Sequence, residues 1–274
     1  MVRNLQEDIV MIVKGLEWTF DTVASAYEKF RPGYPDELYK MIFDYITLDR
    51  SCHAIEIGIG GGQATLPFLK TKCDLVAVEY GEQLAELCKE KFKEYSNFSV
   101  IASKFEDINF SDDIYDLVYS SSAFHWLPEK VGYTKVFSML KHGGAFARFA
   151  NHPYRAKDNL PLSEEIDRIY GEYYYSFYNK KQEAPKEYTE EQAEQRAKLA
   201  EKYGFTDIKY ALFHRTRTFS ANEYCALLGT YSDHIAIEES IRKKFFSKIE
   251  EAINSHGGLI TLYDTVDLQL ARKA

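Results

Sequence analysis

Between residues 53 and 151, short apolar runs alternate with amphipathic stretches, and this alternation restricts the fold more than any other feature. Apolar residues recur with helical spacing over 62–70, 82–95 and 128–140, so we expect helices there. We expect strands at the apolar runs 53–58, 73–80, 98–103, 115–122 and 143–151. Apolar strands that alternate with helices are typical of βαβ units, which build a mostly parallel sheet covered on both faces. The sequence therefore predicts an α/β, doubly wound, Rossmann-like fold.

The segments that flank this core have different patterns. Before it, the sequence predicts helices over 5–30 and 36–46, separated by the turn RPGYP at 31–35. After it, strands at 204–219 and 259–272 enclose two helices, 221–230 and 238–258. We expect these strands to bring the sheet to seven and to form a separate pair of antiparallel type.

These patterns divide the chain into three parts. We expect an N-terminal helical cap and a ligand-binding core at 1–154, a helical lid or insertion at 155–203, and a C-terminal part at 204–274 that completes the sheet. The lid is polar and rich in tyrosine. Its aromatic stretch YYYSFY (173–178) either packs the lid or lines a pocket, and packing is the commoner role of such residues.

The composition narrows the classes of partner. The 274 residues carry 34 Lys and Arg against 42 Asp and Glu, a net charge of −8, and the basic residues form no stripe. This balance disfavours a nucleic acid partner but suits a cationic ligand. The sequence contains no run of about 18 apolar residues, so it predicts no membrane span. The four cysteines lie far apart, and we find no metal-binding cluster. We expect a cytoplasmic protein whose oligomeric state the sequence leaves open.

The first strand of the core runs into a glycine-rich turn, AIEIGIGGGQA at 54–64. Glycines between a strand and a helix permit positive φ and let a ligand touch the main chain. The dinucleotide pattern G-x-G-x-x-G fails, because its last position is Gln63, and a phosphate-binding P-loop lacks its lysine. The pattern present is Glu56, Gly58, Gly60 and Gly62 at alternate positions. An ordinary strand-to-helix turn remains the alternative.

A second acid strengthens the ligand interpretation. Glu79 ends the next strand, 21 residues after Gly58. An acid at this position suits hydrogen bonding to both hydroxyls of a ribose. Alone, Glu79 could instead favour the N-terminus of the helix at 82–95. Together with the glycine turn, it indicates a nucleoside site.

The order of these motifs resembles the class I S-adenosylmethionine (SAM)-dependent methyltransferases, of the methyltransferase type 11 kind. The resemblance covers residues 19–150 well and the rest weakly. EIGIGGG resembles the first motif of that family, VEYGEQL the second, KFEDI (104–108) the segment after the third strand, and YDLVYSSSAFHWL (115–127) the fourth-strand motif. In MLKHGGAF (139–146), His142 replaces the usual proline. FDTVASAYEKFRPGYP (20–35) is similar to the N-terminal segment of the branch that includes the trans-aconitate methyltransferases.

This resemblance implies roles at the amino-acid end of SAM. The glycines would bring the backbone against the amino-acid and ribose parts of the cofactor. Glu56 would accept hydrogen bonds from the glycine-loop amides and face the ammonium group, directly or through water. Tyr27 and Arg31 would cover the methionine end, with Arg31 binding its carboxylate as a fork.

The resemblance also implies roles at the nucleoside end and near the methyl group. Glu79 would hold the ribose hydroxyls. Tyr80 and Phe105 would flank the adenine, next to Glu106. Hydroxyl groups that follow the fourth strand would bind around the methionine moiety, namely those of Ser120 and Ser121. S-adenosylhomocysteine would be the product.

The candidates for catalysis and for acceptor binding are fewer. Methyl transfer from a sulfonium is an in-line displacement, which needs a general base only if the acceptor must lose a proton. His125 is a candidate base or substrate contact, and a capping or packing histidine is the equal alternative. Trp126, Tyr231 and His234 are candidate substrate contacts. For Trp126 the alternative is packing, and YSDHIA (231–236) could be a helix cap in a polar break between two helices.

We therefore expect a SAM-dependent methyltransferase that acts on a small molecule. The resemblance favours an organic acid as the acceptor, and trans-aconitate-like activity is its most specific form. Two alternatives remain. One is methylation of a protein acceptor, and the other is a non-catalytic protein that keeps the SAM fold as a binding module.

Overall fold

The computed structural model describes residues 15–274. Its first elements are the 3-10 helix η1 (Glu17–Val23) and the helices α1 (Ala24–Phe30) and α2 (Asp36–Tyr45). The predicted turn at 31–35 lies between α1 and α2 and is confirmed. Of the helix predicted over 5–30, the part at 5–14 lies outside the described residues.

The alternation of strands and helices in the core is confirmed. The strands are β1 (His53–Ile57), β2 (Asp74–Glu79), β3 (Phe98–Ala102), β4 (Tyr115–Ser121) and β5 (Leu140–Tyr154). The helices between them are α3 (Thr65–Lys70), α4 (Glu82–Lys91) and α5 (Glu129–Met139), with 3-10 turns η2 (Phe105–Asp107) and η3 (Phe124–Trp126). The helix predicted at 62–70 begins later, because the glycine turn extends to Ala64.

The sheet has seven strands, as expected, and their order is β3-β2-β1-β4-β5-β7-β6. The first five are parallel, and β7 (Leu259–Lys273) runs antiparallel between β5 and β6 (Phe205–Ser220). The expectation of a separate pair is wrong, because β7 pairs with β5 from Ala145–Arg272 to Tyr154–Tyr263. The last strands are therefore continuous with the core sheet.

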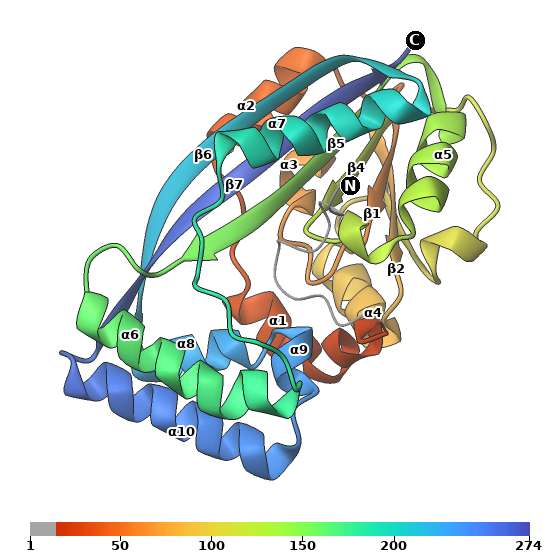
Figure 1. Cartoon of the computed structure of the whole chain (residues 1–274). Coiled ribbons are helices and arrows are strands. Elements are labelled where there is room, and N and C mark those ends of the chain that lie inside the picture. The colour runs from red at the N-terminus through yellow and green to blue at the C-terminus, as the bar shows by residue number, and fades with distance from the viewer. Residues whose placement is uncertain (1–14) are drawn as a thin grey trace.

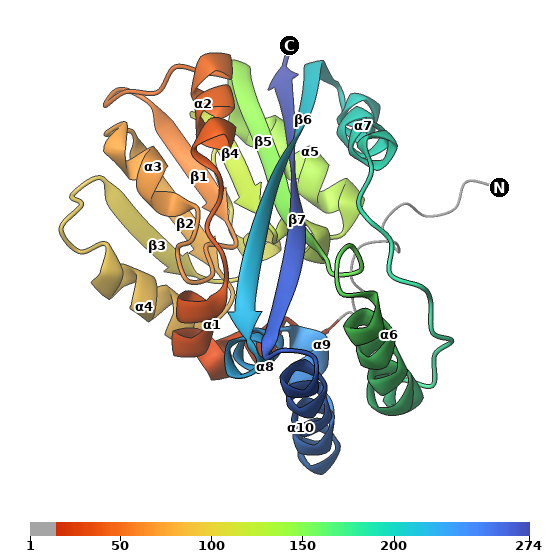
Figure 2. The same ribbon diagram turned by 90° about the vertical axis from the view of Figure 1, so that its left-hand side faces the viewer.

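Each face of the sheet packs against its own helices, because alternate side chains of a strand point to opposite faces. On one face, α2, α3 and α4 cover a core in which Phe68 stacks on Tyr119 with ring centroids 3.9 Å apart. On the other face, α5 covers Val118 and Phe146. α7 (Glu190–Lys198) lies beside β6 and β7 and continues into the 3-10 helix η5 (Leu199–Tyr203) (Figure 2).

A third, helical layer lies beyond the carboxyl ends of the parallel strands (Figure 1). It contains α6 (Leu160–Ile169), the π-helix η4 (Tyr170–Tyr175), α8 (Ala221–Leu228), α9 (Ser232–Ile235) and α10 (Glu239–Ser255). These elements share a core of their own, into which the tyrosines of 173–178 pack. The short helix α9 replaces the polar break expected at 231–236. No helix in the described part of the chain is long and apolar enough to cross a membrane.

Candidate active site

A cavity of about 280 Å³ opens at the carboxyl ends of β1, β2 and β4. The residues at 20–35, which we call the N-terminal segment, and the helix α9 also contribute to its wall. Most of the residues chosen from the sequence lie in its wall. They are Tyr27, Arg31, Gly58, Gly60, Glu79, Tyr80, Phe105, Glu106, Ser121, His125, Trp126 and Tyr231. Four others do not reach the wall, namely Glu56, Gly62, Ser120 and His234.

The glycine turn has the conformation that its sequence requires. Gly58 and Gly60 have φ of +71° and +56°. A Cβ at Gly58 would lie 2.3 Å from the Cβ of Ala123, and one at Gly60 would lie 3.0 Å from the ring of Tyr27. Both positions therefore exclude a side chain, Gly58 because the loop after β4 approaches it and Gly60 because the N-terminal segment does.

Gly62 faces the packed side of the glycine turn. It also has a positive φ, +75°, but a Cβ there would lie 2.6 Å from the ring of Phe92. The close approach is to the packed side of the turn, and Gly62 is absent from the cavity wall. The close approach to Phe92 explains the glycine, and the assignment of Gly62 as a cofactor contact stays a prediction.

Glu56 lies below the turn and is fully buried. The hydroxyls of Thr65 and Tyr119 each donate to its Oε2 at 2.8 Å. Its Oε1 has no hydrogen-bond partner among the described residues. Burial raises the pKa of Glu56 to about 8, although both hydroxyl donors oppose this. The expected bonds from the glycine-loop amides are not present, so this part of the prediction is wrong.

Glu79 is the acid that the loop amides bind. The backbone N–H of Gly60 donates to its Oε2 at 2.8 Å, and that of Gly81 donates to its Oε1 at 3.0 Å. Burial raises the pKa of Glu79, and these backbone donors work against that rise. The carboxyl group thus ties the end of β2 to the turn after β1 and forms part of the cavity wall.

Arg31 enters the cavity from the N-terminal segment. Its guanidinium group lies between the rings of Tyr27 and Tyr231, at 5.0 and 4.2 Å from their centroids. One terminal nitrogen donates to the backbone oxygen of Thr230 at 2.8 Å, and the buried Nε has no partner within residues 15–274. In that range Arg31 also forms no ion pair with a carboxylate. A guanidinium with unfilled donors in a cavity wall fits the carboxylate of an amino-acid ligand.

The N-terminal segment is attached to the core by a helix cap. Asp21 Oδ1 accepts from the backbone N–H of Leu84 at 3.0 Å, in the first turn of α4. Gln63 Nε2 donates to the backbone oxygen of Tyr27 at 3.3 Å. These contacts hold Tyr27 and Arg31 over the glycine turn.

The opposite end of the cavity is aromatic. Tyr80 is 45% exposed, whereas Phe105 is buried. Lys135 Nζ donates to the backbone oxygens of Phe105, Glu106 and Ile108, the last two at 3.0 and 2.5 Å. Lys135 therefore fixes the turn that carries Phe105 and Glu106. Sequence reasoning missed it, since a single lysine on a helix carries no signal for such a contact.

Only one of the two serines chosen after β4 reaches the cavity. Ser121 lies in the wall, whereas the buried Ser120 donates to the backbone oxygen of Ile57 at 2.9 Å, and its assignment as a cofactor contact stays a prediction. The neighbouring Ser122, which was not chosen, does line the cavity and has φ of +51°. Its Oγ lies 2.9 Å from the hydroxyl of Tyr34.

His125 lies in the cavity wall beside Trp126. Burial, followed by the positive charges of Arg196 and Arg148, lowers the pKa of His125 to about 3. The imidazole is therefore neutral at physiological pH and is a weak base. The Trp126 ring meets Phe20 edge-on, with centroids 5.7 Å apart, so it both packs and lines the cavity.

Tyr231 lines the cavity, but His234 does not. The buried His234 is held by Asp233 Oδ1 at 2.8 Å from its Nδ1 and by the Tyr170 hydroxyl at 2.9 Å from its Nε2. Asp233, rather than His234, lies in the wall, and the assignment of His234 as a substrate contact stays a prediction. Across residues 15–274, no group of three or more His, Cys, Asp or Glu is placed to hold a metal ion.

Comparison with known proteins agrees with this geometry. Residues 55–147 match the Methyltransf_11 family, described as a methyltransferase domain. The protein is a SAM-dependent methyltransferase. The methyltransferase-like protein C25B8.10 of Schizosaccharomyces pombe is 24% identical over 234 residues, which cover 85% of either sequence.

Two solved structures share the fold of this methyltransferase. YcgJ of Bacillus subtilis is 14% identical with a TM-score of 0.53, over 88% of this chain and 100% of that one. The phosphoethanolamine N-methyltransferase 2 of Haemonchus contortus is 13% identical with a TM-score of 0.54, over 99% of this chain and 60% of that one. At these identities the likeness concerns the fold alone.

Proposed function

We propose that this methyltransferase transfers the methyl group of SAM to a small-molecule acceptor, with an organic acid as the favoured class. The observation that carries the proposal is the wall of one cavity. It combines the unfilled guanidinium of Arg31, the acid Glu79 at the end of β2, and the neutral imidazole of His125.

The wall suggests how the cofactor would be held. Arg31 would bind the methionine carboxylate, since a guanidinium forms a two-bonded fork with such a group. Glu79 would accept from the ribose hydroxyls, because it already lies between the glycine turn and the aromatic end of the cavity. Tyr80 and Phe105 would flank the adenine, next to Glu106. When bound, SAM supplies a methyl group activated by a positively charged sulfur.

The residues near the methyl group would align the acceptor and exclude water. Ser121, His125 and Tyr231 line this region, and the N-terminal segment covers it. A pKa of about 3 makes His125 a poor general base, so we assign it a substrate hydrogen bond instead. An acceptor carboxylate needs no base, because its oxygen attacks the methyl carbon without losing a proton. The carbon–sulfur bond breaks as the new oxygen–carbon bond forms.

A small acceptor is favoured over a protein by the cover on the cavity. Residues of the N-terminal segment and of α9 form one side of its wall, and the segment is tied to α4 through Asp21. The Haemonchus contortus enzyme was solved with phosphomonomethylethanolamine and S-adenosylhomocysteine, which supports a small acceptor on this fold. A folded polypeptide would have to displace this cover to reach the methyl group.

Transfer of a labelled methyl group tests the proposal. The purified protein would be incubated with methyl-labelled SAM and either a panel of small carboxylic acids, amines and phenols or a dialysed protein extract. We expect label in one or more small acids and none in macromolecules. Label that enters only protein would support the alternative acceptor. Binding of S-adenosylhomocysteine without transfer to any acceptor would support the non-catalytic alternative.

A further inference from the structure

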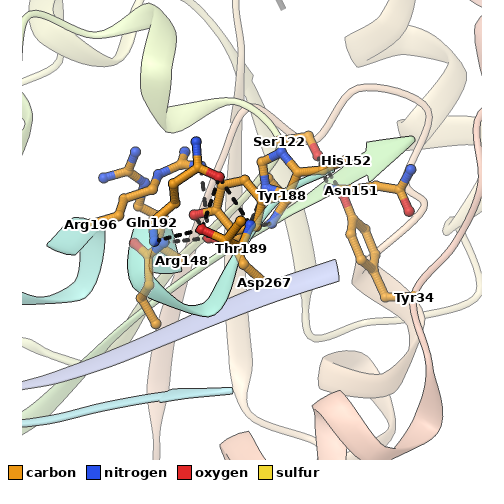
Figure 3. Close-up of polar contacts among 12 residues, drawn as sticks. Tyr34, Ser122, Arg148, Asn151, His152, Tyr188, Thr189, Gln192, Arg196 and Asp267 are labelled. Carbon is orange, nitrogen blue, oxygen red and sulfur yellow. Dashed lines mark hydrogen bonds and ion pairs between the residues drawn. The ribbon is translucent and has the colours of Figure 1, made fainter. Parts of the chain in front are cut away.

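Two buried arginines lie behind the acceptor side of the cavity, together with a histidine and one carboxylate. Arg148 and His152 on β5, Arg196 on α7 and Asp267 on β7 meet on the sheet face that α5 and α7 cover (Figure 3). We call these four residues the buried cationic cluster. It is unexpected in a chain with a net charge of −8, whose surface acids cannot compensate charges inside the sheet.

The carboxylate of the cluster, Asp267, already has hydrogen-bond partners at both oxygens. Asp267 Oδ1 accepts from the Ala150 backbone N–H at 3.1 Å and lies 2.9 Å from His152 Nε2. Its Oδ2 accepts from the Tyr188 hydroxyl at 3.3 Å and from the side-chain amide of Gln269. A carboxylate offers about four acceptor positions, so none remains for an arginine.

The two arginines have few partners in consequence. Arg148 and Arg196 are only 6% and 9% exposed. Within residues 15–274, Arg148 makes one side-chain hydrogen bond, from a terminal nitrogen to the Tyr133 hydroxyl at 2.8 Å, and its Nε has no partner. The nearest nitrogen of Arg196 lies 3.7 Å from Asp267 Oδ2 and also has no hydrogen-bond partner there.

This arrangement is costly without a further anion. Each guanidinium has five N–H donors, and buried donors without acceptors are unfavourable. Two guanidinium charges against one carboxylate also leave a net positive charge in a medium of low dielectric constant. Burial and the neighbouring Arg196 both lower the pKa of Arg148, as expected for cations that lack enough counter-charge.

The cluster borders the cavity. Ala150 precedes His152 on the same face of β5, donates its N–H to Asp267, and lines the cavity. The pKa of His125, which is also in the wall, is lowered by burial and then by the positive charges of Arg196 and Arg148. Figure 3 shows the cluster beside Ser122 and Asn151, two further residues of the wall. None of the four cluster residues lines the cavity itself, so the positive charge lies directly behind the part of the wall that Ala150 and His125 form.

We propose that the acceptor is an organic anion and that Arg148 and Arg196 receive its charged group next to His125. This proposal rests on the proposed function and adds a binding site for the acceptor. A carboxylate matches the planar guanidinium fork and would fill the donors that Asp267 cannot. A carboxylate held by two guanidinium groups is a weak nucleophile, so the cluster anchors one group of the acceptor and the methyl group is delivered to another.

The experiment has two arms, so that the two proposals can fail separately. The first titrates the full-length protein with S-adenosylhomocysteine, which tests the cofactor site alone. The second titrates the S-adenosylhomocysteine complex with small mono-, di- and tricarboxylic acids and with their amides, and measures methyl transfer to the same compounds. The variants are Arg148→Gln, Arg196→Gln and Arg196→Lys. The matched control is Lys198→Gln, which removes an exposed charge from the same helix as Arg196.

We expect acids but not amides to bind the complex. Arg148→Gln and Arg196→Gln should each weaken acid binding about ten-fold or more, with S-adenosylhomocysteine affinity changed by less than about two-fold. The KM for the acid should rise more than kcat falls. Arg196→Lys should retain part of the binding, because it keeps the charge without the fork. The control should match the wild type.

Several results would overturn the proposal. Equal binding of acids and amides would show that charge is not recognised. Unchanged acid affinity in folded Arg148→Gln and Arg196→Gln proteins would show that the arginines serve only to attach α7 to the sheet. If neither variant folds, Arg196→Lys with wild-type acid affinity and KM would show the same. Failure of S-adenosylhomocysteine to bind the wild type would overturn the proposed function as well.

Discussion

Replacing Glu56 by glutamine should change how the stability of the protein depends on pH. Glu56 is fully buried, and its pKa rises from 4.5 to about 8 on folding. Between these values the unfolded chain loses the proton and the folded chain keeps it. Stability from this group is therefore complete below about pH 4.5 and is lost as the pH rises toward about 8. Between about pH 5.5 and pH 8 the loss is about 3 kcal/mol.

Glutamine has nearly the same shape and can still accept from Thr65 and Tyr119, but it does not titrate. Urea unfolding of wild type and Glu56→Gln at several pH values would measure the effect. The difference in free energy of unfolding, variant minus wild type, should increase by about 3 kcal/mol between about pH 5.5 and pH 8. Glu94→Gln, at an exposed position, is the control and should show no such gain. A difference between wild type and Glu56→Gln that does not vary with pH would refute the reasoning.

Three further substitutions test the cavity wall. Glu79→Ala should weaken S-adenosylhomocysteine binding about ten-fold or more by calorimetry, and unchanged affinity would contradict the ribose assignment. Gly58→Ala should lower the free energy of unfolding by about 1–3 kcal/mol more than Gly143→Ala. Both glycines have positive φ, but only a Cβ at Gly58 meets a neighbour, Ala123 at 2.3 Å, so equal losses would refute the steric argument. Lys135→Met should free the turn at 105–108, because it removes the donor to three backbone oxygens there. The Kd for S-adenosylhomocysteine should rise several-fold, and the amide hydrogens of the turn should exchange faster. Unchanged exchange would count against this role of Lys135.

The alternation of strands and helices could be predicted because burial on both faces leaves a strong pattern. Apolar runs such as 115–122 are continuous, and each was found within a few residues. The position of β7 could not be predicted, since its pairing with β5 is a contact between distant segments. The short helix α9 was missed for a similar reason, because its four residues are held by the tyrosines of a separate helical layer.

Site residues were predicted well where a motif fixes the position of the backbone. They were predicted less well where the role depends on which hydrogen-bond partner a side chain has. Gly58, Gly60 and Glu79 reach the cavity because they end parallel strands at one edge of the sheet. Glu56 and Ser120 end neighbouring strands too, but both turn to partners inside the protein. The spacing of residues in the sequence does not indicate which hydrogen-bond partner such a side chain will have. The buried cationic cluster was also invisible, because Arg148, Arg196 and Asp267 come from three distant segments.

The most direct test of the account is calorimetric titration of the wild-type protein and of Arg31→Met with S-adenosylhomocysteine. Arg50→Met, at an exposed position, serves as the control. The account predicts one-to-one binding to wild type and control, and at least about ten-fold weaker binding to Arg31→Met, because the ligand carboxylate loses its guanidinium partner. Absence of binding to a folded wild-type sample, or equal binding to all three proteins, would contradict the cofactor site described for this cavity.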